Sequence, residues 1–153
     1  MPSALVHRPI AAAAGGGWAY ANAHHLPPMQ AFLETVGGVG GGYLGGAAPD
    51  WIDPPISPRH RHYGHGVVNV WTALALSAEA VAGYQQRLRA QADAFLAERA
   101  YLTDDWARLW NWLQEMFLRF LVGVLNGFVA GYLSHLALDA CTPQGLNFIG
   151  RGC

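Results

Sequence analysis

The chain has no lysine, so its nine basic residues are all arginine, and charged residues make up only 12% of the sequence. An average soluble domain carries about 25% charged residues. The formal net charge is −1, so the chain lacks the basic excess with which proteins bind nucleic acids through charge. The composition therefore gives no strong signal for a nucleic-acid partner, and its apolar character raises the question of membrane association.

Cysteine is also scarce. The only two, Cys141 and Cys153, cannot build a disulfide framework. The N-terminal residues carry too little charge before their apolar part, and too few bulky side chains, to match a cleavable signal peptide. The length fits a single domain over residues 1–153.

Long apolar runs are few and imperfect. Residues 120–138 contain no Asp, Glu, Lys or Arg, and they approach the ~20 residues that cross a bilayer core. Asn126 and His135 interrupt this run, and two further runs, 62–78 and 31–49, are shorter or rich in glycine. Together the three runs favour a membrane-embedded or membrane-associated helical protein. A soluble protein with unusually apolar helices is the alternative.

The local pattern predicts an all-α protein, a compact bundle of four to five helices. Helices are expected over residues 4–23, 29–47, 65–100 and 103–140. The first should be weakened or broken at Gly15–Gly17, and Pro28 can start the second. The proline-rich segment 48–64 reads as a loop. Thr103 is the expected N-cap of the last helix.

Gly38, Gly42 and Gly46 stand four residues apart in the second expected helix, so they share one face. Small residues on one face let helices approach closely. The segment is therefore interpreted as a packed helix, against the alternative of a flexible glycine loop.

His135 and Asp139 interrupt the last apolar run. Residues four apart on a helix have Cβ atoms roughly 6 Å apart, so one metal ion can take both, or the carboxylate can orient a ligating imidazole. The alternative is a His–Asp pair that satisfies itself in a core. Burying both groups is unfavourable unless something compensates them.

A second group of candidate ligands occupies the proline-stiffened loop. Its members are Asp50, Asp53, His60 and His65. Imidazole is the commonest transition-metal ligand at neutral pH, although exposed loop histidines and turn aspartates are the alternative. His7 is a further candidate, whereas His62 would point elsewhere and His24 reads as a turn residue.

A mixed His and Asp set suits Zn²⁺ first and Mn²⁺ or Fe²⁺ second, with one or two ions. Two neighbouring ions activate water and hold a phosphoryl oxygen. Arg61 or Arg59 would then bind a phosphate, or remain a solvated loop charge. Asp53 is the candidate general base if it is not a ligand.

Three islands of this sequence resemble one known family. The segments are "VHRPI" (6–10), "PDWIDPPISPRHRHYGH" (49–65) and "GYLSHLALDACTPQG" (131–145). In this order they are similar to the signatures of the YdjM-like, LexA-binding family of bacterial inner-membrane-associated metal-dependent hydrolases. The C-terminal island is the most specific of the three, and the N-terminal island the least.

This resemblance implies a metal site at seven positions: His7, Asp50, Asp53, His60, His65, His135 and Asp139. It also implies a distant similarity to zinc-dependent phospholipase C and the zinc single-strand nucleases, which are all-helical enzymes acting on phosphodiesters. The chain departs from the family where Gly64 and Gly66 flank His65 in place of hydroxyl residues. The spacing from Asp50 to Asp53 is also one residue longer than in many members.

The sequence therefore predicts a metal-dependent hydrolase of phosphoesters, such as a lipid head group, at the bacterial inner membrane. The alternative is a non-enzymatic membrane protein that acts as an oligomeric pore or an interaction partner. In that case the glycine-rich helix at 29–47 would join copies of the chain into a homo-oligomer.

Overall fold

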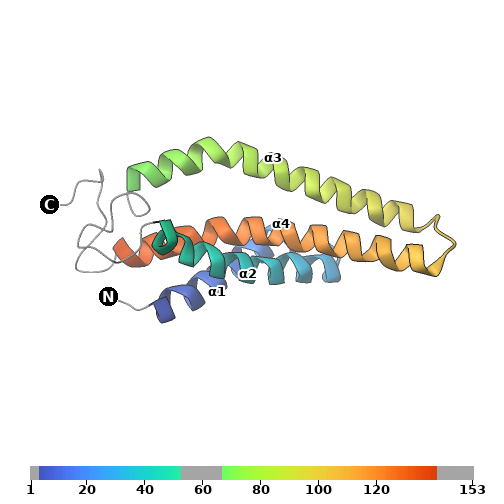
Figure 1. The fold of residues 1–153 in the computed structure, drawn as a ribbon, viewed down its shortest axis with the longest axis horizontal. Coiled ribbons are helices and arrows are strands. Elements are labelled where there is room, and N and C mark those ends of the chain that lie inside the picture. The colour runs from blue at the N-terminus through green and yellow to red at the C-terminus, as the bar shows by residue number, and fades with distance from the viewer. Residues whose placement is uncertain (1–3, 53–66, 141–153) are drawn as a thin grey trace.

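The computed structural model describes the backbone of residues 4–52 and 67–140, and the side chains of residues 7–52 and 79–139. In these residues the chain forms four helices: α1 (Ala4–Ala23), α2 (Pro28–Ile52), α3 (Val67–Arg99) and α4 (Asp105–Ala140). Successive helices run in opposite directions, so α2 and α4 point the same way (Figure 1). The predicted all-α bundle is confirmed.

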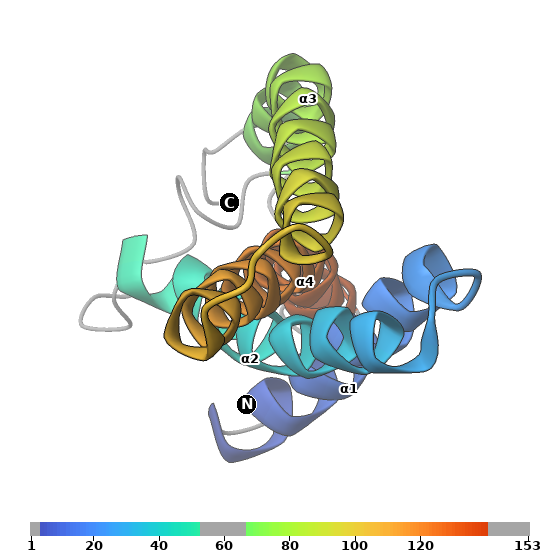
Figure 2. The same ribbon diagram turned by 90° about the vertical axis from the view of Figure 1, so that its right-hand side faces the viewer.

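The helices differ in length, and this shapes the molecule. α1 has 20 residues and α2 has 25, whereas α3 has 33 and α4 has 36. Seen end-on, α1, α2 and α4 pack together, and α3 lies along α4 on the side away from α1 (Figure 2). The connected ends of α3 and α4 therefore extend beyond α1 and α2 as a helical hairpin (Figure 1).

Glycines bring α2 and α4 into backbone contact. A methyl group added at Gly127 would lie 2.0 Å from the carbonyl oxygen of Gly38, and one added at Gly131 would lie 2.2 Å from that of Gly42. No side chain fits into such gaps, so the two helices approach as closely as small residues allow. The sequence separation between the α2 glycine and the α4 glycine is the same in both pairs. The two parallel helices therefore stay in one register along this contact.

The same glycine row also contacts α1. A methyl group at Gly15 would lie 2.4 Å from the Gly38 carbonyl oxygen, and one at Gly42 would lie 2.3 Å from that of Ala11. The prediction that Gly38, Gly42 and Gly46 share a packed face is confirmed. Within one chain α1 and α4 cover this face, and the interface between copies that the sequence suggested stays a prediction.

Two helix boundaries differ from the predictions. α1 continues unbroken through Gly15–Gly17, since Gly15 and Gly16 are buried and their contacts with α2 offset their low helix propensity. α2 starts at Pro28 as expected but runs through Pro49 to Ile52, so residues 48–52 are helical where the sequence predicted a loop. Pro49 removes one helical hydrogen bond, but it is fully buried and packing keeps the helix intact.

The N-cap of α4 is Asp104 and not Thr103. The backbone N–H of Ala107 donates to Asp104 Oδ2 at 2.7 Å, which is the contact that an N-cap side chain makes with the first turn. Thr103 lies one residue too early, because α4 begins at Asp105.

The surface of α2 reverses the usual distribution of side chains. Its buried positions include six of its seven glycines, all except Gly40, while Phe32, Val39 and Tyr43 are 61%, 45% and 45% exposed. Small residues inside and large apolar residues outside are the pattern of helices that meet lipid. Among the described residues, α4 is the one helix long and apolar enough to cross a membrane, although a core helix has the same properties.

Candidate metal centre

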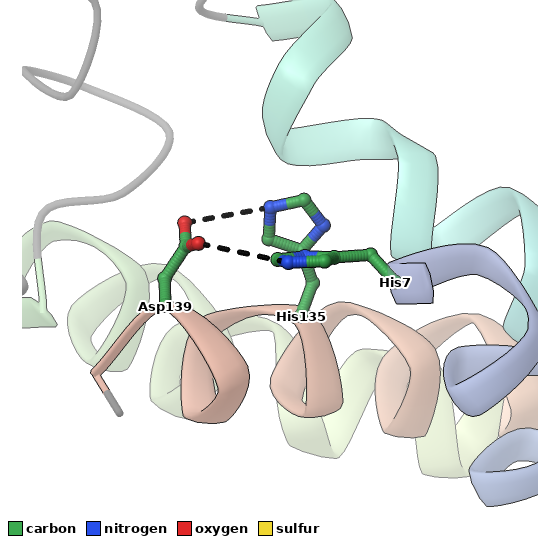
Figure 3. A group of neighbouring side chains, drawn as sticks. All are labelled: His7, His135 and Asp139. Atoms are coloured by element: carbon green, nitrogen blue, oxygen red, sulfur yellow. Dashed lines mark ion pairs between the residues drawn. The ribbon is translucent and has the colours of Figure 1, made fainter. Parts of the chain in front are cut away.

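Three helices bring four polar side chains together at one end of the bundle, and we call this set the histidine cluster. α1 supplies His7, α2 supplies Asp50, and α4 supplies His135 and Asp139. Figure 3 shows three of these side chains, His7 approaching from α1 toward the two residues of α4. The side chains of His7, His135 and Asp139 are at most 6% exposed, and that of Asp50 is 32% exposed. Asp50 therefore marks the side open to solvent.

The residues converge because each continues a row of small residues. On α2 the fourth residue after Gly46 is Asp50, and on α4 the positions after Gly131 at the same spacing are His135 and Asp139. On α1, His7 stands four residues before the buried Ala11. Since the small residues hold the three helices together, the polar residues that end the rows must meet.

The distances within the histidine cluster are those of neighbours around a shared point. His135 Nε2 lies 3.5 Å from Asp139 Oδ2 and 3.7 Å from Asp50 Oδ1. His7 Nε2 lies 4.0 Å from Asp139 Oδ1, and the two imidazole rings meet edge to face with centroids 4.4 Å apart. Each of the four groups thus lies within hydrogen-bonding or near-contact range of another where α1, α2 and α4 meet.

A backbone carbonyl sets the orientation of His135. Its Nδ1 lies 2.5 Å from the carbonyl oxygen of Gly46. A carbonyl can only accept a hydrogen bond, so Nδ1 carries the proton and donates it. In a neutral ring Nε2 then keeps its lone pair, and this atom faces Asp50 and Asp139. Metal-ligating histidines are commonly held in this way, by a hydrogen bond from their second nitrogen.

The residues present fit a divalent metal ion. One ligand atom from each of His7, His135 and Asp139 lies within 4.8 Å of the others. Two ligands of a tetrahedral zinc ion, each about 2.1 Å from it, stand roughly 3.4 Å apart, close to the shorter distances of this cluster. Two imidazoles with a carboxylate suit Zn²⁺, Mn²⁺ or Fe²⁺. The buried triad could therefore hold a metal ion, and its donor set leaves the identity of the ion open.

The charge of the histidine cluster favours a cation. With neutral imidazoles, Asp50 and Asp139 give its four residues a formal charge of −2. Placing a carboxylate away from water is unfavourable unless a positive group compensates it. A divalent ion would balance the two carboxylates of this cluster.

The structure brings together four of the residues that the sequence predicted, namely His7, Asp50, His135 and Asp139. It shows their proximity, and their role as ligands remains a prediction. The other four candidates lie outside the described residues. These are Asp53, His60, Arg61 and His65.

A second polar cluster, built around the buried Glu34, Glu115 and Arg119, lies toward the other end of α2 and α4, and sequence reasoning missed it. We call it the arginine cluster. It comprises Glu34, Arg89, Asp93, Arg99, Glu115 and Arg119. Arg89 Nη2 lies 2.6 Å from Glu34 Oε2, and Arg119 Nη1 lies 3.9 Å from Glu34 Oε1. Arg119 also pairs with Asp93, and Arg99 with Glu115.

A signal for the arginine cluster was present in the spacing of α4. Glu115 and Arg119 precede Gly123 at the same interval of four residues that leads to His135 and Asp139. Reading the glycine row in both directions would have placed polar groups at both of its ends.

Comparison of the chain with protein-family models, with curated proteins and with solved structures found no match. The similarity of the three sequence islands to the YdjM-like family is therefore untested and remains a prediction from the motifs.

Proposed function

We propose that this protein is a divalent-metal-dependent hydrolase of phosphoesters that acts at a membrane surface. The observation that carries the proposal is the buried triad of His7, His135 and Asp139, whose ligand atoms lie within 4.8 Å of one another. His and carboxylate donors bind the ions that enzymes use to hydrolyse phosphoesters. Such an ion, when bound, lowers the pKa of water and polarises a phosphoryl oxygen.

The chain's own residues would divide the work. His7, His135 and Asp139 would hold the ion from the buried side, and the Gly46 carbonyl keeps the His135 ring in one orientation. Asp50, on the exposed side of the cluster, would complete the ligand set. Asp53 remains the proposed general base, Arg61 the proposed phosphate-binding residue, and His60 and His65 the proposed additional ligands.

Two observations support a membrane location. α4 has the length and composition of a membrane span, and α2 exposes large apolar side chains while it buries glycine. A phospholipid head group is then the phosphoester closest at hand. The bacterial inner membrane as the site of action rests on the motif resemblance alone.

Metal analysis of the purified protein tests the proposal. We expect about one or two equivalents of zinc, manganese or iron per chain after gentle purification, and loss of at least one in the His7→Gln variant. His24→Gln is the matched control, because His24 lies just beyond the other end of α1 and is exposed. Equal metal content in wild type and His7→Gln would refute the metal site.

Turnover is tested separately with a chromogenic phosphodiester and with phosphatidylcholine vesicles. The metal-loaded wild type should release nitrophenolate or the phospholipid head group, and His7→Gln should be at least about a hundredfold slower. A protein that binds metal but hydrolyses neither substrate would retain the metal centre and lose the hydrolase assignment.

A further inference from the structure

The N-terminal part of α4 carries a row of large apolar side chains that the chain itself leaves uncovered. Trp106, Trp110, Leu113 and Phe117 are 73%, 58%, 43% and 60% exposed, and Leu109 beside them is 45% exposed. We call these five residues the α4 stripe. The intervals of four, three and four residues place Trp106, Trp110, Leu113 and Phe117 on one face of the helix.

α2 reaches α4 as far as Glu115, where Gln30 Nε2 donates a hydrogen bond to Glu115 Oε1 at 3.0 Å. α2 begins at Pro28, and the backbone of α4 first meets an α2 glycine at Phe120, where a methyl group on Gly37 would lie 2.1 Å from the Phe120 carbonyl oxygen. Before that point α3 lies along α4, and the groups of α4 that it pairs with include Asn111 and Glu115. Trp106, Leu109, Trp110 and Leu113 thus precede the Gln30 contact at Glu115, and Phe117 follows it.

We propose that the α4 stripe is the contact between two copies of this chain. A helix of a second copy would cover the stripe in the way that α2 covers α4 from Phe120 onward. Aromatic side chains bury about 150–250 Å² each when fully covered, so the stripe offers on the order of 500–600 Å² per copy. A symmetric pair would bury about 1,000–1,200 Å², the lower bound for a specific interface.

Shape and charge also suit a second copy. A groove of about 380 Å³ opens between α3 and α4 beside the stripe, with Phe95, Phe117 and Leu118 among the side chains that line it. Such a groove can receive an indole ring from the partner copy. Gln114 and Met116 beside the stripe are neutral, and Glu115 pairs with Arg99 on α3. Asp105 and Arg108 near its start carry opposite charges and lie 3.9 Å apart. Two copies therefore meet with little like-charge repulsion.

The test measures oligomeric state by light scattering coupled to size exclusion, in mild detergent and again in lipid nanodiscs. Wild type should be a dimer at micromolar concentration, and Leu113→Glu should weaken the dimer about a hundredfold or more, because it places an unpaired charge in the interface. Leu96→Glu is the matched control, since Leu96 lies on α3 of the same hairpin and is also 43% exposed. It should remain dimeric.

Circular dichroism of each variant checks that the helices are intact. A wild type that is monomeric in both detergent and nanodiscs would overturn the proposal and leave lipid as the cover of the stripe. A Leu113→Glu variant that stays dimeric, or a Leu96→Glu control that dissociates equally, would also overturn it. The interface does not depend on the metal centre, and the His7→Gln variant should dimerise as wild type does.

Discussion

The carboxylates gathered at the two ends of the paired helices α2 and α4 are compensated differently. In the arginine cluster three carboxylates meet three guanidinium groups, so the chain supplies its own balancing charge. In the histidine cluster the carboxylates of Asp50 and Asp139 meet imidazoles, which carry a positive charge only when protonated. The first cluster is electrically complete without a ligand, whereas the second gains from an added cation.

This difference separates a structural role from a functional one. Guanidinium groups stay charged at any physiological pH and hold carboxylates in fixed geometry. Neutral imidazole is weaker compensation, but its unprotonated nitrogen can bind a metal. The same helix pair therefore presents one closed polar cluster that ties α3 to α4 and one cluster suited to a ligand.

The largest expected change in stability is at the arginine cluster. Replacing Arg119 with Met keeps most of the side-chain volume but removes a guanidinium that is 1% exposed and pairs with Asp93 and Glu34. Breaking a buried ion pair costs about 3–5 kcal/mol. We expect the lower part of this range, because Glu34 keeps Arg89. Chemical unfolding measures the loss, and metal content per folded chain should not change. A variant as stable as wild type would remove the distinction between the two ends.

In the histidine cluster, removing a charge should change metal-dependent stability and not the stability of the metal-free protein. Asp139→Asn removes one of two carboxylates, so the metal-free protein should be about as stable as wild type. Zinc at about 100 times its dissociation constant should stabilise wild type by about 2.7 kcal/mol and leave Asp139→Asn unaffected. Melting curves with zinc and with a chelator measure both quantities. A chelator that leaves the wild-type curve unchanged after zinc loading would contradict the cation requirement of this cluster.

Much of the fold could be predicted from local patterns. The all-α class follows from composition and local pattern. The shared face of Gly38, Gly42 and Gly46 follows because residues four positions apart lie on one side of a helix. The boundary errors share one cause. Glycine and proline disfavour isolated helices, but at Gly15 and Pro49 tertiary packing outweighs local propensity.

The candidate site was predictable in part, because His135 and Asp139 share a helix. Their closeness to His7 and Asp50 depends on the register between three helices, which no local pattern contains. The two arginine pairs that reach from α3 to Glu34 and Glu115 were missed for the same reason. Charged residues spaced along α3 look like a solvated face until the partner helix is known.

The glycine row between the two clusters can be tested with two adjacent positions. A methyl group at Gly41 would lie 2.1 Å from the Val124 carbonyl oxygen, whereas one at Gly40 would meet nothing within 4 Å. Gly41→Ala should destabilise the protein by about 1–3 kcal/mol, because it forces α2 and α4 apart. Gly40→Ala should stabilise it by about 0.5–1 kcal/mol through helix propensity. Thermal unfolding of both variants gives the comparison, and equal effects would mean that α2 and α4 do not touch along this row.

The smallest expected effect concerns a carboxylate that needs neither an arginine nor a metal. Asp104 is exposed and accepts the N–H of Ala107, so the backbone and the helix dipole of α4 compensate its charge. Asp104→Ala should cost about 1 kcal/mol, and Thr103→Ala less than about 0.5 kcal/mol. Urea unfolding resolves this difference. If Thr103→Ala were the more costly change, Thr103 and not Asp104 would be the N-cap of α4.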